Sequence, residues 1–292
     1  MSEHEHARAG SRDVWTFVAF SHGWTWTFWI LAAGWGVSVW HMPATVFFVI
    51  GGAGVFLGGL VMSRVTYGPA GLRDLGQRLT DLGRIGARWW AAILLLYPTL
   101  TLVAAGLALA GDATAQPLDL ASAAARLVNP LALLAMIGFI LIIGPLPEEM
   151  GWRGYLLDRL QERWNALTAS LVLGLVWWTW HLPLFVLPGY FDAFGRAAPT
   201  PLDLLYGILA SAIVYTWVYN NTRRSVLAVV VLHFMQNFTG EFLGMAEEAR
   251  PIRLALEVGL ALAVIAWWKP ETLRRDRALE RPPLTSGAGT GL

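Results

Sequence analysis

The sequence contains no cysteine and carries little charge, and both absences narrow what the protein can be. Without cysteine there are no disulfide bonds, thiolate metal sites or thiol nucleophiles. Only 14% of the 292 residues are charged and 56% are apolar, a balance that ordinary soluble domains of this length do not show. Because 21 basic residues stand against 20 acidic ones, the net charge gives no reason to expect a nucleic-acid partner. The composition indicates a lipid bilayer as the protein's surroundings.

The sequence contains long runs of apolar residues. A helix needs about 20 apolar residues to cross a hydrocarbon core of roughly 30 Å, and eight segments approach that length. The sequence therefore predicts an all-α polytopic membrane bundle of about eight transmembrane helices, with no internal repeat and no second domain. The predicted spans are Trp15–Trp35, Val46–Met62, Trp90–Ala110, Leu131–Ile143 with its continuation, Leu167–Leu187, Leu202–Tyr219, Ser225–Gly240 and Leu254–Trp268.

The basic residues between these spans predict the orientation in the membrane. Cytoplasmic loops retain positive charge, and with the N-terminus inside, the inside segments carry 17 basic residues against four outside. We therefore expect an integral protein of a bacterial inner membrane with both termini in the cytoplasm. Residues 1–14 would form a cytoplasmic tail, and residues 269–292 a second tail that is partly disordered because Pro, Gly, Ser and Thr dominate its end.

Two weaker patterns concern the second span and the segment after it. Between Gly71 and Arg88, apolar residues recur at helical spacing among arginines and aspartates, which predicts an amphipathic helix on the cytoplasmic face. Within the span, Gly54-x-x-x-Gly58 would allow another helix to approach closely, but in a chain with 30 glycines the match is weak.

A few ionisable side chains lie inside the predicted spans, where each costs roughly 2.5 kcal/mol or more unless it has a partner or a task. Taken singly, a histidine or asparagine at such a depth is a polar contact between helices. Charged residues beside them favour a functional site instead. The three clusters are Glu148 with Glu149 and Arg153, then His181, and then His233 with Asn237.

The rise per residue of an α-helix predicts that these clusters lie at similar depths in the membrane. If the fourth and fifth spans form a hairpin that turns near Trp164 and Asn165, Glu148 and His181 both lie about 25 Å along their helices from the turn. Since part of that length stands in the interface, the pair lies roughly 13–18 Å below the cytoplasmic surface. His233 lies about 12 Å into the seventh span, so the three groups can converge.

Spacing within the first cluster assigns different tasks to its two glutamates. Residues four apart share a helix face, so Glu149 can pair with Arg153. Glu148 projects about 100° away from Glu149 and can face a cavity. Two adjacent carboxylates in an apolar site tend to separate in pKa, so that one stays ionised against its arginine and the other can become a base. This arrangement suits general-base activation of water.

In their order and spacing, the motifs resemble those of the CPBP family, which includes CAAX prenyl proteases of the second type and bacteriocin-processing (Abi) enzymes. The resemblance covers about residues 145–238 and implies a transmembrane protease domain over residues 15–268. Trp177 stands where phenylalanine is commoner, and it remains a bulky aromatic residue. The matching motifs are Glu148-Glu149-x-x-x-Arg153, Trp177-x-x-x-His181 and His233-x-x-x-Asn237.

The resemblance implies an intramembrane endopeptidase that hydrolyses a peptide bond near the cytoplasmic side of the membrane. Its partners would be the lipid bilayer and a peptide or membrane-anchored protein substrate. By the same resemblance, Glu148 and His181 would activate water, and His233 and Asn237 would polarise the scissile carbonyl or hold the oxyanion. Glu149, Arg153 and Trp177 would support the site.

The family is described both as metal-dependent and as glutamate-type, which bears on the cofactor. A divalent metal such as zinc, bound by Glu148, His181 and His233, would leave a fourth position for water. The sequence leaves both schemes of water activation open.

Two other classes of protein were weighed against the peptidase. A proton-coupled transporter or channel also buries Glu, His and Arg, but its inverted repeat and symmetric helix breaks are absent from the sequence. A non-catalytic scaffold or immunity protein on the same fold would not need its motif residues intact. Other membrane protease signatures, His-Glu-x-x-His and Gly-x-Gly-Asp, do not occur, and Ser38 lacks the late-helix histidine of a rhomboid site. His22, with no acidic neighbour, is expected to be structural.

Overall fold

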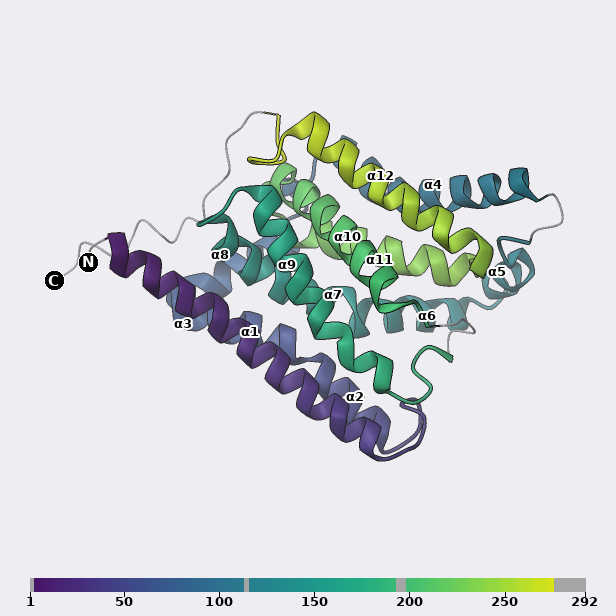
Figure 1. Cartoon of the computed structure of the whole chain (residues 1–292), viewed down its shortest axis with the longest axis horizontal. Helices are drawn as coiled ribbons and strands as arrows, with labels where there is room; N and C mark the ends of the chain where they lie inside the picture. Colours follow the sequence, from purple (N-terminus) through teal and green to yellow (C-terminus); the bar gives the residue numbers. More distant parts are fainter. Residues whose placement is uncertain (1–2, 113–115, 193–197, 276–292) are drawn as a thin grey trace.

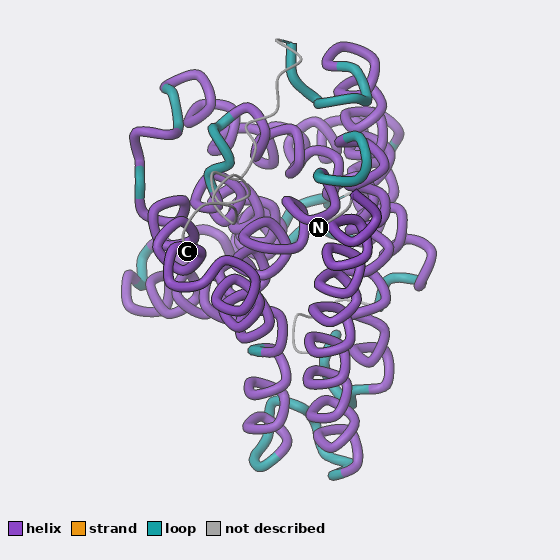
Figure 2. The backbone as a smooth tube through the Cα atoms, turned by 90° about the vertical axis from the view of Figure 1, so that its left-hand side faces the viewer, coloured by secondary structure: helices purple, strands orange, loops and turns teal. Residues whose placement is uncertain are grey.

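The computed structural model describes residues 3–112, 116–192 and 198–275, with the side chains of residues 3–11 left undescribed (Figure 1). Across these residues the chain forms helices joined by turns and loops, and Figure 2 shows no strand among them. One isolated bridge pairs Leu118 with Met245. The predicted all-α class is confirmed, while the end of the predicted C-terminal tail lies outside the described residues.

Twelve α-helices and four short helical turns are described. The α-helices are α1 (Glu3–Gly34), α2 (Ala44–Gly52), α3 (Gly54–Thr80), α4 (Ala87–Gly111), α5 (Leu120–Leu127), α6 (Pro130–Ile143), α7 (Pro145–Gly151), α8 (Leu157–Gln161), α9 (Ala166–His181), α10 (Pro201–Asn221), α11 (Val226–Leu243) and α12 (Arg250–Trp268). The short turns are η1 (Leu82–Arg84), the π-helix η2 (Trp152–Leu156), η3 (Leu182–Val186) and η5 (Glu247–Ala249).

Seven helical segments of the described chain are long and apolar enough to cross a membrane. Two of them combine several helices, since α2 and α3 together make one and α6 to α8 make another. The first predicted span is the exception, because His22 and several tryptophans make α1 less apolar than the others. α1 nevertheless lies along α2 and α3 (Figure 1), and its helix begins at Glu3, within the predicted N-terminal tail. Seven of the eight predicted spans therefore correspond to these segments, and the first, α1, stays a prediction.

The loops gather at the two ends of the bundle as the charge alternation predicts. At one end, Arg84 donates a hydrogen bond of 2.6 Å to the carbonyl of Arg223. Asn220 at the same end donates to Gln161 and to the carbonyl of Thr272. Three loops, between α3 and α4, between α8 and α9, and between α10 and α11, therefore meet the segment after α12 at one end of the bundle. We call it the arginine-rich end. Its assignment to the cytoplasm stays a prediction.

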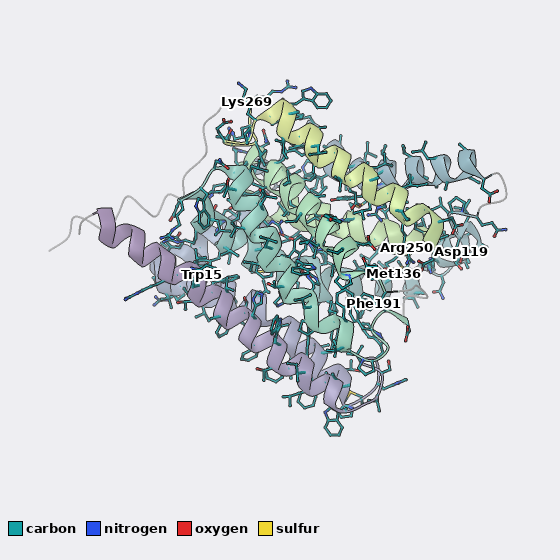
Figure 3. The ribbon with its side chains drawn as sticks, in the orientation of Figure 1. Trp15, Asp119, Met136, Phe191, Arg250 and Lys269 are labelled. Atoms are coloured by element: carbon teal, nitrogen blue, oxygen red, sulfur yellow. The ribbon has the colours of Figure 1, made fainter. Side chains whose placement is uncertain are left out.

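The other end collects the remaining loops. Val39 donates a backbone hydrogen bond of 2.8 Å to Pro188, and Ala246 donates one of 3.0 Å to Pro117. In Figure 3, Asp119 and Arg250 mark this end, whereas Lys269 lies toward the arginine-rich end. Each of these loops therefore lies at the end that the alternation of spans predicts. For the loop between α1 and α2 to lie at this end, α1 has to run the length of the bundle.

The predicted amphipathic helix is the second half of α3. The backbone leaves helical geometry at Gly68, where φ is +65°, and the helix resumes at Pro69 and ends at Thr80. The prediction of a helix as far as Arg88 was too long, because η1 and a short extended segment separate Thr80 from α4. Arg78 also differs from expectation, since its side chain is buried rather than solvated.

Glycines let α3 approach its two neighbours closely. A Cβ at Gly54 would lie 2.5 Å from the Thr25 hydroxyl of α1, so the weak glycine motif does mark a close helix contact. A Cβ at Gly59 would lie 2.7 Å from the carbonyl oxygen of Met150, and one at Gly151 would lie 2.4 Å from the carbonyl oxygen of Val55. This contact fixes α7, the helix of the two glutamates, against α3.

Replacing Gly151 by alanine is therefore expected to destabilise the protein by about 1–3 kcal/mol, because the new methyl group meets backbone atoms that cannot move aside. Thermal unfolding in detergent would measure the loss. The matched control is Gly138→Ala in α6, where an added Cβ meets nothing within 4 Å. Equal unfolding temperatures for the two variants would contradict this account of the α3–α7 contact.

Candidate active site

A break between α6 and α7 delivers the two glutamates to the interior. Gly144, with φ −124° and ψ −92°, ends the regular geometry of α6, and Pro145 starts α7 at a position where a missing N–H costs nothing. Glu148 and Glu149 follow in α7 with exposed fractions of 7% and 0%. Buried carboxylates need partners, and both have them.

Glu149 lies at the centre of a buried ion cluster. Arg153 Nη1 donates to both carboxylate oxygens of Glu149, at 3.0 and 2.9 Å. His233 Nδ1 contacts Glu149 Oε1 at 2.9 Å from α11. The predicted pairing of Glu149 with Arg153 is confirmed. The contact with His233 was not predicted, because no spacing rule links residues 84 positions apart.

Two aromatic rings complete the surroundings of Arg153. Its guanidinium carbon lies 5.0 Å from the ring centroid of Trp177 and 4.9 Å from that of Tyr215. Cations are attracted to the faces of such rings, most strongly when desolvated. Tyr215 was not predicted, because it lies in the most buried stretch of α10 and carries no motif signal.

Within the described residues, only one carboxylate oxygen of Glu148 accepts a hydrogen bond. The indole N–H of Trp177 donates to Glu148 Oε2 at 2.7 Å. The second oxygen, Oε1, and Asn237 Nδ2 both lie 3.7 Å from the point where a Cβ on Gly144 would stand. The absence of a side chain at Gly144 therefore leaves room beside Glu148 and Asn237. Trp177 does more here than a phenylalanine could, because phenylalanine has no N–H to donate.

His181 joins the same group from the last turn of α9. Its Nδ1 contacts the carbonyl of Trp177 at 2.9 Å, which leaves Nε2 available. The ring is half-buried and lies close enough to Glu148 and His233 to interact with both electrostatically. The predicted convergence of Glu148, His181 and His233 thus takes place around Trp177, whose ring centroid lies 5.9 Å from that of His181 and 5.4 Å from that of His233.

The packing around the site is asymmetric. From Glu148 to Leu160 every residue except Met150 is buried, so the path toward the arginine-rich end is filled. In the other direction Asn237 is exposed, and Ile140 is the one buried residue of α6. α6 and Asn237 therefore form the exposed side of the cluster, and the stretch from Glu148 to Leu160 forms its packed side.

Glu148, His181 and His233 stay the predicted ligands of a divalent metal, should the protein bind one. Within residues 3–112, 116–192 and 198–275, no group of three or more His, Asp or Glu side chains is arranged to hold a metal ion. Glu148 Oε2 contacts Trp177, His181 Nδ1 contacts a carbonyl, and His233 Nδ1 contacts Glu149, which leaves one further oxygen or nitrogen on each side chain.

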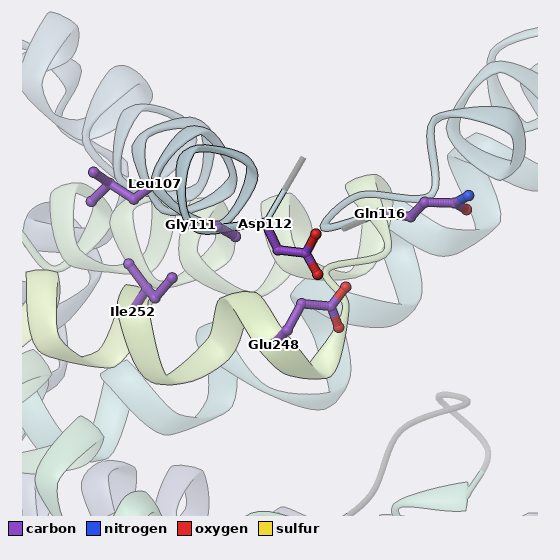
Figure 4. A pocket seen from close by; sticks show the side chains of 7 residues that line it. Leu107, Gly111, Asp112, Gln116, Glu248 and Ile252 are labelled. Carbon is purple, nitrogen blue, oxygen red and sulfur yellow. The ribbon is translucent and has the colours of Figure 1, made fainter. Parts of the chain in front are cut away.

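A surface cavity of about 500 Å³ lies elsewhere, at the end opposite the arginine-rich end. Figure 4 shows Asp112 and Glu248 pointing toward one another beside it. None of the motif residues lines this cavity, whose walls come from α4, η5 and α12 and from the loop that follows α4. It is separate from the glutamate and histidine cluster.

Comparisons with known proteins address the same stretch of chain. The family of type II CAAX prenyl endopeptidases, Rce1-like, matches residues 130–239, which include every motif residue named above. This segment matches the CAAX protease family. A relative, CAAX prenyl protease 2 of Methanococcus maripaludis, is 32% identical over 133 residues, or 45% of this chain and 49% of that protein. The chain thus spans about half the length of the curated relative that it matches.

The resemblance drawn from three short motifs is therefore confirmed as a CAAX protease family relationship.

The structure also shows the contacts of two polar residues outside the motifs. His22 contacts the Thr179 hydroxyl at 3.1 Å and the carbonyl of Val176, which agrees with its structural assignment. Glu257 was overlooked within the eighth predicted span, and it pairs with Arg253 at 2.9 Å.

Proposed function

We propose that this chain is an intramembrane endopeptidase of the CAAX protease type, acting on a prenylated or otherwise membrane-anchored protein. The observation that carries the proposal is the state of Glu148. One of its oxygens is fixed by Trp177, and the other lies beside Asn237, with His181 and His233 nearby. A buried carboxylate held on one side and free on the other is suited to accept a proton from water.

The reaction would begin with Glu148 Oε1 taking a proton from a water molecule that His181 helps to orient. The oxygen of that water forms a bond to the scissile carbonyl carbon, and the electron pair of the double bond moves to the carbonyl oxygen. The electron pair on that oxygen then re-forms the C=O bond, and the C–N bond breaks as the proton passes from Glu148 to the departing nitrogen. One water is consumed and two peptide products leave, so Glu148 ends in its starting state.

His233 and Asn237 would stabilise the negative oxygen of the intermediate. Glu149 accepts from His233 Nδ1, which turns the ring and leaves Nε2 to donate when the imidazole is protonated. Asn237 offers an amide N–H₂ four residues further along the same face of α11. Donors aimed at a developing oxyanion in a site of low dielectric provide one of the largest contributions to catalysis.

We place the reaction nearer the arginine-rich end of the bundle. Glu148 is 13 residues from Gln161, or about 20 Å of helix, and 18 residues from Pro130, or about 27 Å. On the charge count, that end faces the cytoplasm. The filled packing below Glu148 means that a substrate reaches this depth from the side of α6 and Asn237.

Cleavage of a lipid-modified peptide tests the proposal. Purified protein in detergent is expected to cleave a peptide that ends in a prenylated C-a-a-X sequence, and the His181→Ala variant is expected to lose that activity. The same peptide without the prenyl group would show whether the lipid is recognised. If wild-type protein and His181→Ala release product at the same rate, these residues do not catalyse the reaction.

The alternative classes find less support. A transporter or channel is not favoured by a family whose members are peptidases, and a scaffold would not need the hydrogen bond that fixes Glu148. Ion flux into vesicles that contain the protein would nonetheless identify a channel directly.

A further inference from the structure

A second buried ion cluster lies between the candidate site and the arginine-rich end. Asp158 of α8 accepts hydrogen bonds from Arg78, Tyr219 and Arg224. Arg78 Nε also lies 2.8 Å from Asp74, one turn earlier on α3. Arg78, Asp158 and Arg224 are buried, with exposed fractions of 3%, 6% and 5%. Removing a charged side chain from water costs free energy, so these buried charges are expected to serve the structure or the function of the protein.

Arg78 also contacts the backbone of the π-helix. Its Nη2 donates to the carbonyl of Gly154 at 2.7 Å, and its Nη1 lies 3.4 Å from the carbonyl of Arg153. The amide of Leu157 donates to the carbonyl of Trp152, five residues back, so the carbonyl of Arg153 loses its regular α-helical donor. Buried carbonyls require donors, and the guanidinium supplies them.

The extra residue of the π-turn changes which way the following side chains point. Glu149 and Asp158 are nine residues apart, which in a regular α-helix would place them about 180° from one another. One inserted residue reduces the angle to about 80°. Glu149 can then face Arg153 and His233 while Asp158 faces Arg78 and Arg224. Both ion clusters therefore depend on the same turn.

We propose that Arg78 is a positioning residue for the active site, which acts by holding the π-turn that contains Arg153. Arg78 touches no motif side chain, and its effect passes through the backbone of residues 153 and 154. The role in catalysis rests on the proposed function, whereas the role in holding the turn does not.

Two measurements on Arg78→Met and Arg78→Lys test the proposal, with Arg73→Met, an exposed arginine on the same helix, as the matched control. In Arg78→Met, amide hydrogen exchange over residues 152–161 is expected to rise about tenfold or more, since the turn loses its donors. The turnover number is expected to fall about tenfold to a hundredfold with little change in KM. In both measurements, Arg78→Lys should give values between those of Arg78→Met and wild type, and Arg73→Met should give wild-type values.

Unchanged exchange in Arg78→Met would overturn the proposal, and so would faster exchange with an unchanged turnover number. A rise in KM alone would also overturn it, because a displaced turn affects the chemical step. If Arg78→Met does not fold, the Arg78→Lys comparison decides in the same way. If wild-type protein cleaves no substrate, the proposed function fails, and the exchange measurement still decides whether Arg78 holds the turn.

Discussion

Replacing Glu148 by glutamine is expected to lower the rate of peptide cleavage by about a hundredfold to ten-thousandfold, the range over which general-base catalysis contributes. Glutamine keeps the size of the side chain and can still accept the hydrogen bond from Trp177, so the fold around α7 should survive. What it cannot do is take a proton from water. The initial rate on a prenylated peptide, measured with both proteins at equal concentration in the same detergent, would show the loss.

The control for this variant is Glu247→Gln, which makes the same change at an exposed carboxylate in η5. Its cleavage rate should match that of wild type within about twofold. Retention of more than about a tenth of the wild-type rate by Glu148→Gln would exclude Glu148 as the general base. Circular dichroism and elution volume should be unchanged in both variants, so that a loss of activity reflects chemistry.

A second large effect is expected when Arg153 is replaced by methionine. Glu149 and Arg153 are both 0% exposed, and removing one partner of a buried pair leaves a charge that the interior cannot solvate. Such a loss costs about 3–5 kcal/mol of stability. Removing both charges together, as in Arg153→Met with Glu149→Gln, should restore most of that stability. Unfolding of the three proteins in detergent by a denaturant would give the values.

The comparison for Arg153 is Arg250→Met, which removes one partner of a half-exposed pair with Glu247. That pair is worth about 1 kcal/mol or less in contact with water. If Arg153→Met were no more destabilised than Arg250→Met, the buried cluster would not contribute to the stability of the fold. If the double variant were less stable than Arg153→Met, the account based on an unpaired charge would be wrong.

Local rules predicted much of this arrangement. The rise of an α-helix is uniform, so counting residues from Trp164 and Asn165 was enough to bring Glu148 and His181 to the same depth. The four-residue spacing of Glu149 and Arg153 was enough to predict their ion pair. The alternation of basic residues sorted the loops correctly between the two ends of the bundle.

Contacts between distant parts of the chain were beyond these rules. Nothing in the sequence marks residues 152–156 as a π-turn, because the turn is stabilised by Arg78, which lies 75 positions earlier than Arg153. The indole N–H of Trp177 finds Glu148 only once α7 and α9 are packed. The first predicted span, α1, is not among the seven segments that are apolar enough to cross a membrane, and its Trp29 packs against Phe48 of α2 and Trp180 of α9.

The break at Gly144 divides the walls of the site into a fixed part and an adaptable part. On one side, α7 is tied to α3 and α11 by close glycine contacts and by the Glu149 ion cluster. On the other, α6 buries Ile140 alone and is not joined to α7 by continuous helical geometry. We therefore expect α6 to change its tilt without disturbing Glu148 and Glu149, because motion concentrates where packing is sparse. On the proposed peptidase function, one moving helix would then accommodate substrates of different bulk, while the same carboxylate would act on all of them.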